Sequence, residues 1–465
     1  MSSVISRNAE FPPRGWNSYD SFSWIATEVD FLENARILQT KRFTDQGYEY
    51  AIVDYLWYRT LEGNNNSLGF DNIDEWGRML PDPGRWPSSM IGGKGFTIVA
   101  NKIQGMGLKF GVHLMAGIST QAYNKNTPIL DTTTGRTYTE FGREWYAKDI
   151  GIPERACSWM NNGFMAVNAA TGAGKAFLRS IYELLGSWGV EYVKLDCVFG
   201  EDLNLDEITT VSQILKDTNS PIVLSLSPGV NATPQMARMV SGLVNAYRVT
   251  GDDWDEWPAV VNHFDVASNF ARGWLIGAPG LKGKSWPDLD MLPFGWLTDP
   301  AANEGPHRFS KLTQDEKKTQ MTLWCMAKSP IMYGGDLRKI DAWELDLITN
   351  PILLGINSFS SNNREACELS LLFSLLIKLH NIEGIRSWVA TRRNKGEAYV
   401  AFFNLNDENK KVSANIAELD VVIPDRNFTS CTGREIWSGN NTKTNDIFSA
   451  EVAGHGSALF VLNCQ

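Results

Sequence analysis

The segment VEYVKLDC (residues 190–197) is a short apolar run that ends in charged residues. Five further runs of this kind alternate with segments of helical period: YEYAIVDY (48–55), LKFGVHLM (108–115), PIVLSLSP (221–228), NAYRVTGD (245–252) and SPIMYGGD (329–336). Apolar strands that alternate with helices are typical of parallel βα units. The pattern predicts a (β/α)8 TIM barrel over residues 11–357. A doubly wound open sheet is the alternative, but no glycine-rich dinucleotide motif follows the first strand.

The pattern changes after Asn357. From Ser387 onward the chain consists of short alternating runs separated by turn residues, which predicts an antiparallel β-sandwich domain over residues 385–465. A linker over residues 358–384 joins it to the barrel and contains the apolar run LSLLFSLLIKLH (369–380). That run is too short to span a bilayer, and its apolar face needs a surface to pack on.

Composition restricts the class of partner. The formal net charge of −10 and the pI near 5.2 argue against nucleic acid or an anionic membrane surface, because an acidic protein is repelled by both. The 17 Trp, 13 Tyr and 22 Phe are compatible with a large core and also with pockets that stack on sugar rings. A neutral substrate therefore fits the composition best.

The amino terminus has no apolar segment of the signal-peptide type, which taken alone indicates an intracellular protein. Against this, four N-glycosylation sequons, at Asn65, Asn231, Asn427 and Asn440, would each place a surface loop in a secretory compartment. The two observations leave the compartment open at this level.

Three aspartates, Asp54, Asp196 and Asp252, stand at predicted strand ends and would converge at the barrel mouth. Two carboxyl groups in such a mouth are what glycoside hydrolysis requires, because one attacks or stabilises the anomeric carbon while the other donates a proton to the leaving oxygen. Asp253 and Asp255 follow Asp252 closely, so spacing alone does not decide which of the three acts.

Two basic residues accompany these carboxylates. Lys194 is two residues before Asp196 and should point to the same side of its strand, where its charge would lower the pKa of Asp196. A salt bridge at the rim is the alternative. Arg248, four residues before Asp252, shares the inward side of its strand and could donate hydrogen bonds to sugar hydroxyls.

Cysteine and histidine give no sign of metal or thiol chemistry. Cys197 adjoins Asp196, and a neighbouring carboxylate raises a thiol pKa, so a buried thiol or a disulfide with Cys157 is expected. The five histidines show no close pairing, which leaves His113 as a strand-end residue and disfavours a metal-dependent hydrolase or isomerase. We therefore expect neither a metal nor a cofactor.

Eight ordered segments resemble the motifs of glycoside hydrolase family 27, the α-galactosidase or melibiase family. They are GWNSYDSF (15–22), VDYLW (53–57), LPDPGRWPSS (80–89), GLKFGVH (107–113), YVKLDC (192–197), RVTGDDWDEW (248–257), SWPDLDML (285–292) and AKSPIMYGGDLR (327–338). The resemblance is strongest to plant β-L-arabinopyranosidase and α-galactosidase enzymes. It implies a retaining double displacement that acts on glycans or glycosides bearing terminal galactose or arabinopyranose. Because such relatives begin with a secretory signal, it also implies a secreted or cell-wall protein, with the vacuole as the alternative.

The resemblance also implies roles for individual residues, transferred motif by motif. Asp196 matches the nucleophile and Asp252 the acid/base. Trp16 matches a pocket-wall aromatic residue, and Asp54 matches a carboxylate on the O4/O6 side of galactose. Lys194 and Arg248 match residues that contact sugar hydroxyls, and Asp290 matches a further motif position near the pocket.

Two departures from the family pattern concern specificity. Tyr55 stands where α-galactosidases have a second aspartate that accepts from the galactose O6. Because β-L-arabinopyranose lacks the C6 hydroxymethyl group, Tyr55 predicts a preference for arabinopyranosides of roughly 1 to 3 kcal/mol, unless its ring turns into the barrel wall. Ser227 stands where a glutamate usually faces O2, which makes α-N-acetylgalactosaminidase activity an alternative. A catalytically silent glycan-binding barrel is the other alternative, and the presence of both Asp196 and Asp252 argues against it.

Overall fold

The computed structural model describes residues 9–64, 68–93, 95–300, 302–366, 384–392, 396–416, 419 and 429–465. They divide into two compact units. The first comprises the described residues of 1–254, 277–310 and 331–341, and the second those of 255–276, 311–330 and 342–465. Among all the described residues, no helix is both long enough and apolar enough to cross a membrane.

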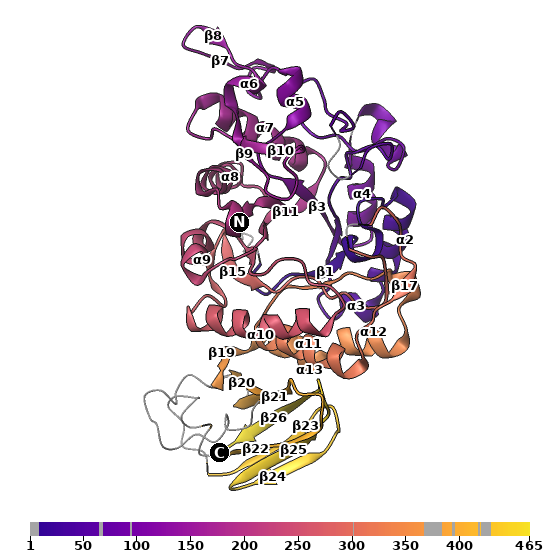
Figure 1. The fold of residues 1–465 in the computed structure, drawn as a ribbon, viewed down its shortest axis with the longest axis vertical. Helices are drawn as coiled ribbons and strands as arrows, with labels where there is room; N and C mark the ends of the chain where they lie inside the picture. Colours follow the sequence, from indigo (N-terminus) through magenta and orange to yellow (C-terminus); the bar gives the residue numbers. More distant parts are fainter. Residues whose placement is uncertain are drawn as a thin grey trace, which may run out of the picture. The chain divides into compact units, whose positions relative to one another are not determined.

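The first unit is built on a barrel of parallel strands (Figure 1). In chain order the strands are β1 (Arg14–Asn17), β2 (Tyr50–Val53), β3 (Lys109–Met115), β11 (Val190–Phe199), β12 (Val223–Pro228), β13 (Ala246–Arg248), β15 (Gly283–Asp288) and β18 (Ile331–Tyr333). Each pairs in parallel with its neighbour, and β1 pairs with β18 as well as with β2. A parallel bridge between Leu292 and Tyr333, with Leu292 N donating to Met332 O at 2.7 Å, closes the ring. The predicted (β/α)8 barrel is confirmed.

Helices in the connections begin at polar capping residues. Thr27, Thr171 and Asn204 accept backbone N–H groups at the starts of α2 (Glu28–Leu38), α7 (Gly172–Ser187) and α8 (Leu205–Asp217). Such caps satisfy donors that the first helical turn leaves unpaired. One face of each helix is buried, as the alternation of apolar and polar residues predicts.

Many of the aromatic side chains, including eight of the 17 tryptophans, belong to the core. The Phe96 ring packs edge to face against four other rings. Its centroid is 5.1 Å from that of Trp57, 5.0 Å from that of Trp86, 5.2 Å from that of Phe110 and 5.8 Å from that of Trp188. Edge-to-face packing of large rings adds to the gain from their burial. The aromatic-rich composition is therefore explained largely by packing, and only a few rings remain as candidates for sugar contacts.

The connection between β3 and β11 is long and carries a small sheet of its own. Strands β4 (Ile118–Ser119), β10 (Phe164–Val167) and β9 (Gly151–Ala156) pair antiparallel in the order β4-β10-β9. Cys157, directly after β9, forms a disulfide with Cys197 in β11. This bond confirms the disulfide alternative for Cys197 and ties the connection to the strand that carries Asp196.

The second unit contains helices and the C-terminal β-sandwich. The helices are α10 (Trp257–Arg272), α11 (Gln314–Met326), α12 (Ala342–Ile348) and α13 (Pro351–Phe359). One antiparallel sheet has the order β19-β20-β21-β26-β23-β24, and β22 (Lys410–Asn415) pairs with β25 (Ile447–Val452). The other bounds are β19 (Ser361–Glu365), β20 (Ile385–Arg392), β21 (Glu397–Asn404), β23 (Cys431–Glu435), β24 (Asn441–Thr444) and β26 (Ser457–Cys464). The predicted sandwich is confirmed.

The segment expected to link barrel and sandwich begins with structure of its own. Ser361–Glu365 forms strand β19, which pairs antiparallel with β20. The apolar run at 369–380 lies outside the described residues. Cys431 and Cys464, on the paired strands β23 and β26, form a second disulfide.

Candidate active site

Asp54, directly after β2, is held by side chains from β1 and β11 and by the backbone of the next residue. Its Oδ2 atom accepts from Asn17 Nδ2 at 2.8 Å and from Lys194 Nζ at 3.1 Å, and its Oδ1 atom accepts from Tyr55 N at 2.8 Å. Burial opposes ionisation of Asp54, but the Lys194 ammonium, His113 and these hydrogen bonds outweigh it and lower the pKa of Asp54 to about 2. Asp54 is therefore a fixed negative charge at the barrel mouth.

Asp196, in β11, is buried and is held by a histidine. His113 Nε2 lies 2.9 Å from Asp196 Oδ2, and the backbone N–H of Cys197 donates to Oδ1. Burial would raise the pKa of Asp196, but the hydrogen bond and charge of His113, followed by Lys194 and the Cys197 N–H, lower it below its usual value. An ionised, oriented carboxylate of this kind is suited to nucleophilic attack.

The charge of Lys194 contributes to the lowered pKa of Asp196, as its position on the strand predicts, but its salt bridge is formed with another carboxylate. Its Nζ atom pairs with Asp54 rather than with Asp196, and it lies 5.7 Å from the centre of the Tyr19 ring. Burial disfavours the ammonium, but Asp54 and other carboxylates raise the pKa of Lys194 above its usual value. His113, which the sequence indicated only as a strand-end residue, is the group that holds Asp196.

Arg248, at the end of β13, connects two carboxylates. Its Nη1 atom lies 2.7 Å from Asp290 Oδ1, and its Nη2 atom lies 3.4 Å from Asp252 Oδ1. Nη2 also donates to Gly251 O at 2.6 Å. The guanidinium is buried, whereas the Asp252 side chain is 44% exposed. Asp252 is thus an accessible carboxyl group beside a buried cation.

Asp253 and Asp255 differ from Asp252 in burial and in hydrogen-bond partners. Asp253 is buried, and its backbone N–H donates to Asp290 Oδ2 at 2.7 Å. Asp255 is buried in the second unit, where it accepts from Lys311 N at 2.7 Å. Among the three carboxylates that spacing left as alternatives, only Asp252 combines exposure with the contact to Arg248.

Two further buried carboxyl groups, Asp290 and Asp20, interact with the charges of the site. Burial raises the pKa of Asp290 to about 6 in spite of Arg248, helped by the neighbouring Asp252. Asp20 is fully buried, and its carboxyl oxygens have no hydrogen-bond partner among the described residues. Burial, followed by Asp290, raises the pKa of Asp20 well above its usual value. Asp20 is an acidic group that the sequence analysis did not identify.

Tyr55 lies at the mouth and not in the barrel wall. Its ring centroid is 5.4 Å from that of Tyr19, 6.0 Å from that of His113 and 6.0 Å from that of Trp159. Burial raises the pKa of Tyr55 to about 12, so the phenol is neutral at ordinary pH. Tyr55 therefore adds an apolar ring beside the Asp54 carboxylate, where a second carboxylate would add charge.

Trp16 is not brought to the mouth. It is fully buried, its ring packs 5.5 Å from Phe31 of α2, and its Nε1–H donates to Gly335 O at 2.8 Å. Because Asn17 points inward to Asp54, the preceding residue on the strand must point outward. The aromatic residue that does reach the mouth is Tyr19, whose ring lies 5.8 Å from Trp254. The structure thus places Tyr19, and not Trp16, beside Lys194 and Tyr55.

Ser227 is buried at the end of β12, before a cis peptide bond to Pro228. Its small side chain leaves this strand end without a charged group. The strand-end residues therefore differ around the ring: carboxylates on β11 and after β2 and β13, a histidine on β3 and a hydroxyl on β12.

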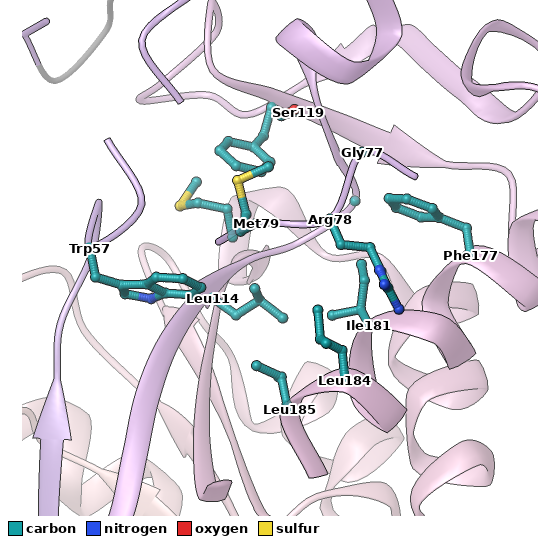
Figure 2. A pocket seen from close by; sticks show the side chains of 13 residues that line it. Trp57, Gly77, Arg78, Met79, Leu114, Ser119, Phe177, Ile181, Leu184 and Leu185 are labelled. Atoms are coloured by element: carbon teal, nitrogen blue, oxygen red, sulfur yellow. The ribbon is translucent and has the colours of Figure 1, made fainter. Parts of the chain in front are cut away.

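Two other features of the described residues are separate from this site. One is a mainly apolar cavity of about 20 Å³, which shares no residue with the site. Figure 2 shows side chains that line it, among them Trp57, Leu114 and Phe177. A water molecule nearly fills a space of that size. Asp299, Glu304 and His307 come close enough together to hold a cation, but all three lie toward solvent and Asp299 already pairs with Arg308.

Comparison with known proteins identifies the family of this chain. The family model described as "Alpha galactosidase A" matches residues 180–359, and that described as "Alpha galactosidase C-terminal beta sandwich domain" matches residues 383–462. An α-galactosidase from Schizosaccharomyces pombe is 23% identical, over 96% of this chain and 87% of that protein.

Solved structures give a stronger match. A GH27 β-L-arabinopyranosidase from Geobacillus stearothermophilus, crystallised as a variant in complex with arabinose, is 30% identical with a TM-score of 0.84, covering 100% of this chain and 99% of that chain. A Bacillus halodurans protein provisionally described as an α-N-acetylgalactosaminidase is 30% identical with a TM-score of 0.78, covering 97% of each chain. With its barrel, its sandwich and a mouth lined by carboxylates, this chain is a glycoside hydrolase and belongs to glycoside hydrolase family 27.

Proposed function

We propose that this enzyme is a retaining exo-glycosidase that releases terminal β-L-arabinopyranose in preference to α-D-galactose. The observation that carries the proposal is the position of the Tyr55 ring, beside Asp54 and among the rings of Tyr19 and His113. The likeness to a β-L-arabinopyranosidase supports it independently.

In the first step the Asp196 carboxylate attacks the anomeric carbon. The bond from that carbon to the leaving oxygen breaks as Asp252 transfers its proton to this oxygen, so that the leaving group departs as an alcohol. His113 orients Asp196 and keeps it ionised before the attack. The Asp252 side chain is 44% exposed, so the leaving oxygen of a bound glycoside can reach it.

In the second step Asp252, now a carboxylate, takes a proton from water. The water oxygen attacks the anomeric carbon and Asp196 leaves as a carboxylate, which restores the enzyme. Each step inverts the anomeric centre, so the product keeps the configuration of the substrate. Arg248, whose Nη2 atom lies 3.4 Å from Asp252 Oδ1, helps to orient this carboxyl group.

Specificity follows from what surrounds Asp54. Its carboxylate, fixed by Lys194 and Asn17, provides acceptors for sugar hydroxyls. Tyr55 provides bulk and an apolar face but no negative charge at the adjacent position. A hydroxymethyl group there would lose a charge-assisted hydrogen bond and meet the ring, at a cost of roughly 1 to 3 kcal/mol relative to a pentopyranose.

The test compares kcat/KM for p-nitrophenyl β-L-arabinopyranoside and p-nitrophenyl α-D-galactopyranoside. The wild type should favour the arabinoside, Tyr55→Phe should retain that preference because the ring remains, and Tyr55→Asp should shift it toward the galactoside. A wild type that favours the galactoside, with a ratio unchanged in Tyr55→Asp, would rule the proposal out.

α-N-Acetylgalactosaminidase activity is the second candidate. Ser227 leaves the end of β12 without a charged side chain, and the Bacillus halodurans protein is 30% identical. The p-nitrophenyl α-N-acetylgalactosaminide, included in the same assay, separates the two. Turnover faster than that of both other substrates would favour this second candidate.

A further inference from the structure

An exposed tryptophan lies beside the proposed site. Trp159 is 42% exposed, and its ring centroid is 6.0 Å from that of Tyr55. Tyr55 contacts Tyr19, and Tyr19 contacts Trp254, so four rings form a continuous row, called here the aromatic row. Tyr55 within this row is buried, whereas Trp159 at its end faces solvent.

Single exposed aromatic side chains are common and need no functional explanation. Trp274, which is 82% exposed, is an example in the second unit. Trp159 differs because it touches a residue of the candidate site and because the residues around it are fixed.

The loop that carries Trp159 connects β9 and β10 and is held at several points. Cys157 is joined to Cys197 by the disulfide, and Cys157 N donates to Phe164 O at 3.0 Å. Ser158 Oγ donates to Asp202 Oδ2 at 2.8 Å, and Met160 is buried. An exposed ring between anchored neighbours needs little further ordering to bind a ligand, which is the condition for a preorganised contact.

The covalent anchor places the loop beside the residue that the proposed mechanism assigns to the anomeric carbon. Cys197 is the residue after Asp196, the residue proposed to attack the anomeric carbon. The leaving group is bonded to that same carbon, and in an exo-glycosidase it projects from the buried end of the site toward solvent. A partly exposed ring at the rim is suited to that group, whereas the buried rings are suited to the sugar.

We propose that Trp159 forms a leaving-group site, which takes a ring-shaped group with a flat apolar face: a pyranose of a glycan or an aryl aglycone. This inference rests on the function proposed above. Aromatic side chains contribute large contact areas of this kind at small ordering cost, and the sequence has Trp159 on a long connection that is separate from the strand-end motifs.

The experiment uses three substrates with the same sugar. The p-nitrophenyl β-L-arabinopyranoside and an arabinopyranosyl disaccharide have ring-shaped leaving groups, and β-L-arabinopyranosyl fluoride has none. Trp159→Ala should lower kcat/KM by about ten-fold for the first two and less than about two-fold for the fluoride. A loss for only one of the two ring-bearing substrates would identify which kind of ring the site takes. Trp159→Phe should restore much of the loss, and Trp274→Ala should change none of the three values.

Two results would overturn the proposal: no loss in Trp159→Ala on either ring-bearing substrate, or an equal loss on all three substrates, which indicates a structural role. Failure of the proposed function appears differently, as a wild type that hydrolyses none of the arabinopyranosides. In that case the same series on the sugar that the enzyme does hydrolyse tests the leaving-group site by itself.

Discussion

The two carboxylates on β11 and after β13 are alike in sequence context but different in environment. Asp196 is 7% exposed and is held by His113 and by the N–H of Cys197. The Asp252 side chain is 44% exposed and contacts Arg248 at 3.4 Å. One carboxylate is fixed and kept ionised, whereas the other is open to its surroundings. This difference is the one that a nucleophile and a proton shuttle require.

Burial alone does not produce the difference. Glu207 in α8 is as deeply buried as Asp196, yet burial raises its pKa to about 7, because hydrogen bonds from Gly117 N and Asn204 Nδ2 and the charge of Arg155 do not outweigh desolvation. At Asp196 the hydrogen bond and charge of His113 outweigh the same effect. Two buried carboxyl groups thus move in opposite directions according to their partners.

The largest expected effect comes from Asp196→Gly. Loss of the nucleophile should reduce kcat by on the order of 10⁴-fold or more on any substrate. Added azide should restore turnover of an aryl glycoside or glycosyl fluoride and give a glycosyl azide of inverted configuration, because azide enters from the vacated side. The anomeric configuration is read by NMR. A variant with unchanged turnover would contradict the assignment of Asp196.

Asp252→Ala should have an effect that depends on the leaving group. For sugar or alkyl leaving groups, which need a proton, kcat/KM should fall by about 10² to 10⁴-fold. For a 2,4-dinitrophenyl leaving group, which needs none, the loss should be far smaller. Azide should here give a product of retained configuration. Asp253→Asn, at a buried neighbour, is the matched control. Equal losses with good and poor leaving groups would show that Asp252 is not the acid.

His113→Phe tests what keeps Asp196 ionised. The variant retains a ring but removes the donor to Asp196, so the pKa of Asp196 should rise and the acid limb of the kcat/KM profile should move to higher pH. The loss in kcat/KM should be about 10 to 100-fold, the value of a hydrogen bond to a charged group. His307→Asn, at an exposed histidine, should leave the profile unchanged. An unmoved acid limb in His113→Phe would assign the control of Asp196 to other groups.

Glu207→Gln should affect stability more than catalysis. The folded pKa of about 7 is above the reference value of 4.5, so the folded state binds the extra proton and is favoured below pH 4.5. That contribution, roughly 3 kcal/mol, is lost as the pH rises through 7. The variant should therefore show a shallower decline of the unfolding free energy between pH 5 and 8. Denaturant unfolding at several pH values measures it, and parallel curves for both proteins would contradict the pKa assignment.

The strand-end rule was sufficient to predict the fold and the main carboxylates. Parallel strands of a barrel end on one face, so Asp54, Asp196 and Asp252 could be placed together without knowledge of any contact. Partners across the barrel could not be predicted in this way. Lys194 and Asp54 are 140 residues apart, so their ion pair could not be predicted from spacing, whereas the effect of Lys194 on the pKa of Asp196 could.

Local backbone geometry limited the remaining predictions. The motif GWNSY contains two aromatic residues, and only the inward direction of Asn17 shows that Trp16 faces the helices while Tyr19, beyond the strand, reaches the mouth. Because side chains alternate along a strand, an inward Asn17 implies that Trp16 points outward. No alternation rule applies to Tyr19, which lies after the strand, or to Trp159, which lies on a long connection.

The pairing of β1 with both β2 and β18 has a consequence for biosynthesis. The ribosome makes β1 first, but its second neighbour is complete only at residue 333. A nascent chain that already contains Asp54, Asp196 and Asp252 still lacks the strand that closes the ring. Catalytic competence should therefore not arise before residue 333 has been made, and amino-terminal fragments that stop before β18 should be inactive even though both proposed catalytic carboxylates are present.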